Sequence, residues 1–337
     1  MKKQVAILSG ITGQDGYYLS NFLLDKGYEV HGIYRRTVED IDQRMKHLDK
    51  RVKLHEGDLI DIASLIKIIK LTNPDEVYNL GSQAYVPSSW TQPIATAQIT
   101  GMGVLNMLEA IRQTNIKIKF YQASTSEMIA QLQTSPEPNK ILFHPRSPYG
   151  CAKMFGHYIT QNYRESYDMF ACSGVLYNHE SWRRGSQFVT RKITKAVARI
   201  KLGLQETLEL GNFNAQRDWG FAGDYVEAMW LMLQQDKPKD YVIAMNEAHS
   251  VREFVEEAFK VLDMSITWEG EGINEVGKHN GKVIVKVNPK FYRPAEIDVL
   301  LGDYSKAEKE LGWKPKTRFK DLVKMMVEND LKEEAVK

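Results

Sequence analysis

A short apolar run followed at once by a glycine-rich turn opens the chain and restricts its fold more than any other feature. Residues 5–9 favour a strand, Gly10, Gly13 and Gly16 follow, and residues 17–26 have the apolar spacing of an amphipathic helix. This order of strand, glycine turn and helix is the context that a dinucleotide-binding turn requires. The glycines permit positive φ and close backbone approach, and a helix N-terminus offers N–H groups and a positive dipole end to a diphosphate.

This context decides between two interpretations of the turn. A lone glycine triad is ordinary loop punctuation, whereas a triad placed between a strand and a helix favours a nucleotide site. We therefore expect the diphosphate of a dinucleotide cofactor to bind at the turn residues Gly10, Thr12, Gly13, Gln14, Asp15 and Gly16.

The end of the second expected strand, at 29–34, indicates which dinucleotide binds. Sites that prefer NAD place an acidic residue near this point, where it accepts the ribose hydroxyls. This chain has Arg35 and Arg36 instead, and guanidinium groups suit bidentate contact with a 2′-phosphate. We therefore predict NADP; the alternative is a solvated basic pair at a strand end. Asp58 and Leu59, after the third strand-like run, are expected beside the adenine.

Strand-like and helix-like segments alternate to about residue 175. The alternation predicts βαβ units and an α/β fold with a doubly wound parallel sheet of the Rossmann type. After Asn178 the pattern is less regular and indicates a smaller, irregular lobe, with a hairpin within 269–287 and a solvated end at 332–337. The expected strands lie at 52–55, 76–80, 116–121 and 171–176, and the expected helices at 62–71, 103–113 and 148–166.

The length of 337 residues accommodates a nucleotide-binding domain and a smaller lobe. We expect residues 1–177 to form the NADP-binding Rossmann domain, completed by part of 218–262. Residues 178–337 are expected mainly to form the substrate-binding lobe.

Composition describes an ordinary globular protein and argues against several classes of function. The formal net charge of +2 is too close to neutral for a polyanion-binding surface, so no nucleic-acid partner is expected. Two cysteines, Cys151 and Cys172, provide no disulfide framework and fit a reducing compartment, the cytoplasm. We find no run of about 18 apolar residues and no signal peptide, so no membrane partner is expected. The eight histidines show no zinc-like clustering with cysteine, so no metal is predicted.

Tyr149 precedes Lys153 by four residues, within a segment expected to be helical. On a helix this spacing places both side chains on one face, about one turn apart. An ammonium beside a phenol stabilises the phenolate, which then serves as a base near neutral pH. The spacing alone occurs often by chance, but beside a dinucleotide site it predicts removal of a hydroxyl proton while a hydride leaves the same carbon. Cys151, between the two, is expected to be a packed or helix-surface thiol rather than a nucleophile.

Residues 122–127 follow an expected strand, where open α/β sheets place their active sites. They include the hydroxyls of Thr125 and Ser126 and the carboxyl of Glu127. Such groups can orient a substrate hydroxyl and supply a second acid or base. The alternative is a helix cap, which also selects Ser and Thr.

Together with Tyr149 and Lys153, this segment resembles the extended short-chain dehydrogenase/reductase family, and within it the branch of 4,6-dehydratases that act on GDP-mannose. The resemblance extends over nearly the whole chain, from the glycine turn at 10–16 to residues 311–315. Its most specific segments are 178–181, 184–185, 188–192, 217–220 and 293–296.

The resemblance implies roles for these residues. Tyr149, assisted by Lys153, deprotonates the sugar's 4-hydroxyl. Glu127 removes the proton at the fifth carbon and protonates the departing 6-hydroxyl, so that water is eliminated. Thr125, and less strongly Ser126, hydrogen-bond the reacting oxygens. The product is a 4-keto-6-deoxy sugar, and the cofactor is regenerated in each turnover.

Binding residues are also implied by the resemblance. Leu80, Ser82, Gln83, His179 and Arg184 are expected at the cofactor, with Ser82 also reaching the substrate. Cationic side chains beyond Asn178 are expected to hold the diphosphate of the GDP-sugar, and the resemblance further implies a homotetramer, a dimer of dimers. The expected substrate-binding residues are Asn178, Val189, Lys192, Leu210, Gly211, Asn212, Arg217, Arg293 and Glu296.

Three alternatives stay open at this point. The chain departs from the family pattern at 85–90, at 128–131 and at Trp182. The departures at 85–90 and 128–131 are expected close to the sugar and allow a GDP-manno-heptose as substrate, because its dehydration uses the same chemistry. A nucleotide-sugar epimerase or reductase would keep Tyr149 and Lys153 without needing Glu127. A non-catalytic nucleotide-binding scaffold is disfavoured by the intact Tyr–Lys pair.

Overall fold

The computed structural model describes residues 3–36, 45–129, 143–292, 295 and 297–336. The chain divides into two compact units, of which unit 1 comprises Met1–Leu176, Ala222–Ile243 and Asp303–Lys314. Unit 2 comprises Tyr177–Phe221, Ala244–Gly302 and Pro315–Lys337.

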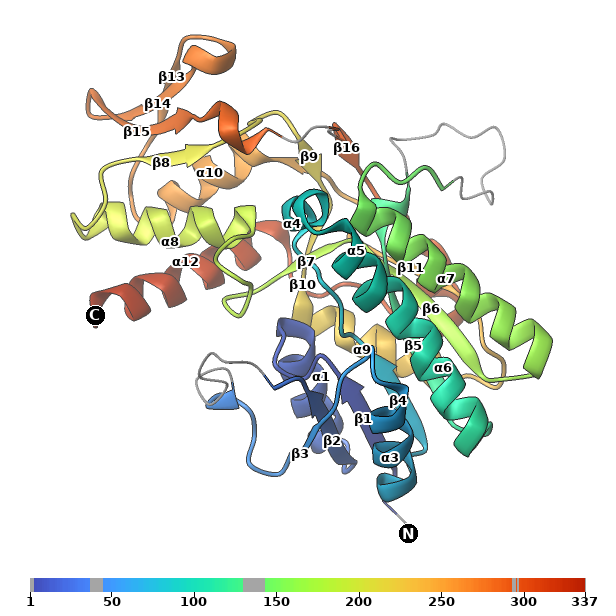
Figure 1. The fold of residues 1–337 in the computed structure, drawn as a ribbon. Coiled ribbons are helices and arrows are strands. Elements are labelled where there is room, and N and C mark those ends of the chain that lie inside the picture. The colour runs from blue at the N-terminus through green and yellow to red at the C-terminus, as the bar shows by residue number, and fades with distance from the viewer. Residues whose placement is uncertain (1–2, 37–44, 130–142, 293–294, 296, 337) are drawn as a thin grey trace. The chain divides into compact units, whose positions relative to one another are not determined.

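Unit 1 is built on a seven-stranded sheet with the strand order β11-β6-β5-β4-β1-β2-β3 (Figure 1). All of its pairings are parallel, and the order reverses between β1 and β4, so the sheet is doubly wound as the alternation predicted. The strands are β1 (Val5–Ser9), β2 (Glu29–Tyr34), β3 (Lys53–Glu56), β4 (Glu76–Asn79), β5 (Lys119–Thr125), β6 (Ala171–Leu176) and β11 (Tyr241–Ile243).

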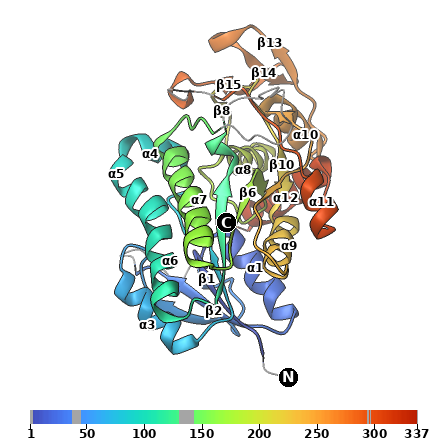
Figure 2. The same ribbon diagram turned by 90° about the vertical axis from the view of Figure 1, so that its right-hand side faces the viewer.

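Helices cover both faces of this sheet (Figure 2), with α1 and α9 on one face and α3, α6 and α7 on the other. A buried apolar cluster including Ile7, Val77 and Phe120 joins the sheet to the second group. The helices of unit 1 are α1 (Gln14–Asp25), α3 (Ile62–Thr72), α4 (Val86–Thr91), α5 (Pro93–Thr96), α6 (Gly103–Thr114), α7 (Pro148–Tyr167), α9 (Ala222–Leu233) and α11 (Ser305–Leu311), with the π-helical η1 (Ala97–Met102) and the 3₁₀ turn η2 (Ser126–Met128).

Most predicted elements of unit 1 form within a residue or two of their expected bounds, but two differ. The strand expected at 116–121 begins only at Lys119 and runs on to Thr125. Asn115 causes the delay, because its side chain accepts the N–H of Lys117 and its carbonyl accepts that of Ile118, which makes a turn. The helix expected from residue 17 begins at Gln14, directly after the glycine turn.

One helical stretch of the described chain, Pro93–Thr114, is long and apolar enough to cross a membrane by length and composition alone. Half of its most apolar window is buried, and it packs against α3 and α7. A core helix passes the same test, so this stretch is weak evidence for a membrane span.

Unit 2 contains three helices that the sequence pattern did not predict: α8 (Val189–Lys201), α10 (Val251–Lys260) and α12 (Phe319–Ala335). Their apolar faces form one buried cluster with Trp219. Its remaining elements are β7 (Asn178–Glu180), β8 (Leu208–Leu210), β9 (Gln216–Arg217), β10 (Trp219–Phe221), β12 (His249–Ser250), β13 (Thr267–Glu269), η3 (Gly272–Asn274), β14 (Val276–His279), β15 (Lys282–Val287), η4 (Pro289–Phe291) and β16 (Val299–Leu300).

The structure contains the hairpin that was predicted for unit 2 and, with one buried exception, the predicted solvated end. The hairpin expected within 269–287 is present, because β14 pairs antiparallel with β15. The solvated end expected at 332–337 is confirmed at Lys332, Glu333, Ala335 and Val336, which are exposed, although this end is helical because α12 continues to Ala335. Glu334 is buried there and forms an ion pair with Arg199 at 2.9 Å, which holds the last helical turn against α8.

Candidate active site

The glycine turn brings backbone segments of unit 1 unusually close together. Gly10 has a φ of +70°, and a Cβ at this position would lie 2.8 Å from the backbone nitrogen of Gly81. A Cβ on Gly16 would lie 2.5 Å from the carbonyl oxygen of Ile11. Gly13 is the N-cap of α1 and provides no side-chain cap. The turn therefore presents backbone and a positive dipole end, the combination that suits a diphosphate.

The other residues expected at the cofactor also follow strands at the carboxyl edge of the sheet, near the point where the strand order reverses. Arg35 and Arg36 come directly after β2 and are exposed. Asp58 and Leu59 follow β3, and Leu80, Ser82 and Gln83 follow β4. The backbone N–H of Gln83 donates to Thr100 at 3.0 Å, which ties this loop to η1.

Helix α7 positions the Tyr–Lys pair. Ser147 caps its N-terminus by accepting the N–H of Gly150 at 3.0 Å, and Pro148 occupies the first turn, where its missing N–H is harmless. Tyr149 and Lys153 are both buried. The Lys153 Nζ lies 5.8 Å from the centre of the Tyr149 ring, so the spacing places both groups together as expected.

Burial sets the charge state of Lys153. Its Nζ donates to the carbonyl oxygen of Ala123 at 2.8 Å. Loss of hydration disfavours the ammonium and lowers the pKa of Lys153 to about 8, although the charge of Asp15 acts in the opposite direction. Burial therefore weakens the preference of this side chain for its charged form.

Glu127 is brought beside this pair by a close contact between two elements. It is buried in the short turn η2, and a Cβ on Gly150 would lie 2.6 Å from the Glu127 carbonyl oxygen. The start of α7 therefore lies directly against the backbone of Glu127. Ser126 is buried in the same turn.

The segment 122–127 does not simply follow a strand, as the sequence indicated. Residues up to Thr125 belong to β5 itself. Thr125 Oγ1 accepts the N–H of Glu127 at 3.2 Å, so the helix-cap interpretation holds for this residue. The cap fixes the turn on which Glu127 stands.

One pair near the site was not predicted. Ser124 Oγ and His157 Nδ1 lie 3.2 Å apart, and both side chains are buried. Burial lowers the pKa of His157, which favours the neutral imidazole. Its position four residues after Lys153, on the same helix face, was the available signal.

The substrate residues expected beyond Asn178 lie in unit 2. Asn178 and His179 stand on β7, which pairs with β10, and His179 Nδ1 donates to the carbonyl of Tyr177 at 2.8 Å. Arg184 forms an ion pair with Glu180 at 3.2 Å and lies over the ring of Phe188.

Lys192 and the segment 210–212 come together around one aromatic ring. Lys192, on α8 as Val189 is, places its Nζ 3.3 Å from the centre of the Phe291 ring, and burial lowers its pKa. A Cβ on Gly211 would lie 2.7 Å from the Phe291 carbonyl oxygen. Leu210 is buried, and Asn212 accepts the N–H of Asn214.

Three cationic side chains beyond Asn178 each have a local partner in the described part of the chain. Arg217 is buried on β9 and donates to the carbonyl of Gln216 at 2.8 Å, so Arg184, Lys192 and Arg217 each have a local partner. Arg293 and Glu296 lie outside the described residues.

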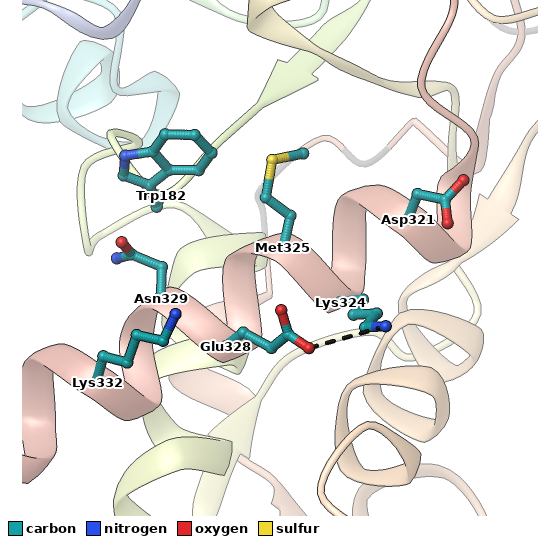
Figure 3. Close-up of a pocket in the computed structure, with 7 residues that line it drawn as sticks. All are labelled: Trp182, Asp321, Lys324, Met325, Glu328, Asn329 and Lys332. Carbon is teal, nitrogen blue, oxygen red and sulfur yellow. Dashed lines mark ion pairs between the residues drawn. The ribbon is translucent and has the colours of Figure 1, made fainter.

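A pocket in unit 2 lies along α12 beneath the indole of Trp182 (Figure 3). Its lining includes the ion pair between Lys324 and Glu328, whose atoms are 3.9 Å apart. The lining residues are Trp182, Asp321, Lys324, Met325, Glu328, Asn329 and Lys332, which do not include the expected substrate residues. Among the described residues, no group of three or more His, Cys, Asp or Glu side chains is arranged to hold a metal ion.

Comparison with known proteins identifies the family. A family model described as GDP-mannose 4,6 dehydratase matches residues 7–326. The chain belongs to the GDP-mannose 4,6-dehydratase family. Within this family, the GDP-mannose 4,6 dehydratase of Drosophila melanogaster is 52% identical over 98% of this chain and 87% of that protein. The one from Homo sapiens is 51% identical over 98% and 92%.

Solved structures agree with the fold of this family. The dTDP-glucose 4,6-dehydratase of Bacillus anthracis, in complex with NAD, has a TM-score of 0.81 at 18% identity, over 98% of both chains. The structure of RMD from Pseudomonas aeruginosa complexed with NADPH has a TM-score of 0.78 at 21% identity, over 98% of this chain and 100% of that one. At these identities the likeness establishes the Rossmann-type fold.

Proposed function

We propose that the protein converts GDP-mannose to GDP-4-keto-6-deoxymannose by eliminating one water, as a hydro-lyase of deoxysugar biosynthesis. The observation that carries the proposal is the close contact of Gly150 with Glu127, because it joins the Tyr149–Lys153 pair to a second acid/base group. The names of the relatives, about half of whose residues are identical to this chain, support GDP-mannose as the substrate.

The cofactor in this proposal is a nicotinamide dinucleotide, specifically NADP. The glycine turn fits the diphosphate of this cofactor, because it is a tight backbone turn. A Cβ at Gly10 or Gly16 would clash with neighbouring backbone and prevent the turn from forming. Arg35 and Arg36, exposed after β2, support a 2′-phosphate over a free ribose. Bound at this turn, the cofactor would supply hydride chemistry: it would serve as acceptor of a hydride from the fourth carbon of the sugar and as donor of a hydride to the sixth.

Tyr149 begins the reaction in this proposal. Its phenolate takes the proton of the 4-hydroxyl, and the nearby Lys153 ammonium stabilises the negative charge on the phenolate. Oxidation at the fourth carbon makes the neighbouring C–H bond at the fifth carbon acidic. Thr125 and Ser126 orient the sugar oxygens.

Glu127 completes the elimination. Its carboxylate removes the proton from the fifth carbon, the electron pair of that bond forms a double bond to the sixth carbon, and the C–O bond to the 6-hydroxyl breaks. The protonated Glu127 donates its proton to the departing oxygen, so water leaves and the carboxylate is restored. When the hydride returns to the sixth carbon, Tyr149 gives the proton that it took from the 4-hydroxyl to the fifth carbon, so the phenolate is also restored. Its burial in η2 keeps bulk water from competing for that proton.

The GDP-sugar is proposed to bind in part through unit 2. Lys192, Phe291 and Gly211 lie together there, and they offer a cation, an exposed aromatic ring and a close approach of two backbone segments. Asn178 and Arg217 are the further polar groups assigned to the substrate.

We also propose a homotetramer, a dimer of dimers, in the cytoplasm. Exposed apolar side chains on α5, η1 and α7 support an oligomer, because these elements pack together and expose Ile94, Met102, Phe155 and Tyr158 on unit 1. The two cysteines are free thiols, which supports a reducing compartment.

The proposal is tested by incubating the purified protein with GDP-mannose and catalytic NADP, without NADPH. Mass spectrometry should show a product lighter by one water. Unchanged GDP-mannose would overturn the proposed function, and an isomer of equal mass would replace it by an epimerase.

A substitution at Glu127 tests the division of labour. Glu127→Gln should still permit hydride transfer from the fourth carbon, read as reduced nicotinamide, but lower the rate of water loss at least about a hundredfold. Glu76→Gln is the matched control, since Glu76 is equally buried in unit 1 but hydrogen-bonds Tyr28 and Tyr78 at the opposite end of β4. The Glu76→Gln variant should eliminate water from GDP-mannose at the normal rate. Normal turnover by Glu127→Gln would remove Glu127 from the mechanism.

A further inference from the structure

A row of buried polar side chains crosses the sheet of unit 1 at its carboxyl edge, although the strands around it are apolar. Ser9 ends β1 and Asn79 ends β4, and Gln122, in the middle of β5, is paired with Asn79; each of the three is at most 1% exposed. Burying neutral polar groups costs free energy unless each finds a hydrogen-bond partner. Here every member has one, and the row leads to Lys153.

The hydrogen bonds run in a single direction. The N–H of Gly81 donates to Ser9 Oγ at 3.1 Å, and the Ser9 hydroxyl donates to Asn79 Oδ1 at 2.6 Å. Asn79 Nδ2 donates to Gln122 Oε1 at 2.8 Å. Gln122 Nε2 then donates to the carbonyl oxygen of Ala123 at 2.9 Å.

The groups at the two ends of this row of hydrogen bonds fix its direction. It starts at a backbone N–H, which only donates, and finishes at a backbone carbonyl, which only accepts. The amides of Asn79 and Gln122 are therefore oriented by the backbone at both ends. Aligned hydrogen bonds of this kind polarise one another.

The carbonyl at the end of the chain is the one that holds Lys153. Ala123 O accepts from Lys153 Nζ at 2.8 Å and from Gln122 Nε2 at 2.9 Å, so two donors share it. The first donor of this row is the N–H of Gly81, and Gly81 lies against Gly10 of the glycine turn. A continuous line of hydrogen bonds thus runs from Gly81, which packs against the turn, to Lys153.

We propose that Ser9, Asn79 and Gln122 form a hydrogen-bond relay that positions the Ala123 carbonyl and limits how strongly it holds the Lys153 ammonium. They are positioning residues, since they act on Lys153 through Ala123. The effect of the relay on catalysis rests on the proposed function, whereas its effect on the titration of Lys153 does not depend on that function.

Other groups around Lys153 must be held constant in a test. Asp15 on α1 favours the ammonium by its charge. Tyr149 and His157 stand one turn away on α7, and Glu127 lies on η2, which packs against α7. Substitutions at Gln122 leave all four in place.

The test measures the titration of Lys153 directly. Protein containing ¹³Cε-lysine is titrated by NMR, and the Lys153 resonance is assigned by its loss in Lys153→Arg. Gln122→Met removes the competing donor, so the Lys153 midpoint should rise by about half a pH unit, the equivalent of one modest hydrogen bond. Gln122→Glu still accepts from Asn79 but replaces the donor with a negative charge, and should raise the midpoint by about one unit.

A neighbouring tyrosine supplies the control. Tyr121 stands on the same strand, is fully buried, and has a hydroxyl without a hydrogen-bond partner among the described residues. Tyr121→Phe should leave the Lys153 midpoint unchanged. If both Gln122 variants also leave it within about 0.2 units, less than one weak hydrogen bond contributes, and the relay is refuted.

The catalytic consequence is measured separately. The alkaline limb of the pH profile of GDP-mannose dehydration should move upward with the Lys153 midpoint in each variant, with KM changed less than twofold. A uniform loss of rate at every pH would mean a merely structural role and would contradict the relay. If the unaltered protein does not dehydrate GDP-mannose, the proposed function fails, while the NMR titration still decides the relay.

Discussion

The two units bury charge in opposite ways. In unit 1, Lys153 is buried at the end of a line of neutral hydrogen-bonding groups, and within the described residues no carboxylate forms an ion pair with it. In unit 2, the helices α8 and α12 bury acids that have basic partners: Asp330 lies 2.6 Å from Arg191, and Glu334 lies 2.9 Å from Arg199.

This difference separates chemistry from architecture. A buried charge without a counter-ion has a shifted pKa and is poised to change its charge state, which catalysis uses. A buried charge with a counter-ion is committed to its partner and holds two elements together, even where its net contribution to stability is small. The comparison predicts that substitutions in the first group change activity and that those in the second change stability.

The largest effect is expected in unit 1. Tyr149→Phe removes one oxygen beside Lys153, and it should lower kcat for dehydration about a thousandfold, because the base of the first step is lost. The melting temperature should change little, since the ring itself is retained. Rate assays and thermal melts on the same preparation check both halves of this prediction.

Tyr163→Phe is the matched control for Tyr149→Phe. Tyr163 lies on the same helix, is similarly buried, and its hydroxyl donates to Glu109 rather than facing the site. It should keep nearly full activity. Equal losses in the two variants would mean that α7 responds to any lost hydroxyl, and the contrast between the units would fail.

An intermediate effect is expected in unit 2. Asp330 is fully buried between Arg191 and the hydroxyl of Thr194, and burial raises its pKa to about 6 in spite of the arginine. Asp330→Ala leaves Arg191 with only part of its compensation. It should lower the free energy of unfolding by about 3 kcal/mol while kcat of the folded enzyme stays the same.

Glu333 provides the comparison within the same cluster. It also pairs with Arg191, at 2.8 Å, but its side chain is 45% exposed. Glu333→Ala should therefore cost less than about 1 kcal/mol in urea unfolding. A cost equal to that of Asp330→Ala would show that burial is not what distinguishes these two carboxylates.

Local patterns in the sequence predicted much of unit 1 and of its site. The strand at 171–176 forms at its expected bounds, and Tyr149 and Lys153 share a helix face, because helix and strand periods are properties of neighbouring residues. The glycine turn was also predicted, because its requirement for small residues is local.

What the sequence did not reveal depends on partners far along the chain. The relay through Ser9, Asn79 and Gln122 requires the order β1-β4-β5, which no local pattern contains. The visible signal was a polar residue at the carboxyl end of β1 and of β4 and another, Gln122, within β5. Likewise Glu334 reads as a solvated terminal residue until Arg199, 135 positions away, is placed beside it.

The smallest expected effect tests the comparison at a buried titratable pair of unit 1 that lies outside the site. His31 Nδ1 and His55 Nε2 are 2.8 Å apart, so one ring nitrogen must remain unprotonated, and burial lowers the pKa of both from the ordinary 6.5. The unfolded chain therefore binds more protons as the pH falls below 6.5, and stability is lost in that range.

Between pH 7.5 and 5.5, His55→Gln should lose about 2 °C less in melting temperature than the unaltered protein. The exposed His47→Gln should behave like the unaltered protein. A change in the pH profile of catalysis in His55→Gln would contradict the comparison, because His31 hydrogen-bonds His55 and Glu29 and, among the described residues, no hydrogen bond links this pair to Lys153.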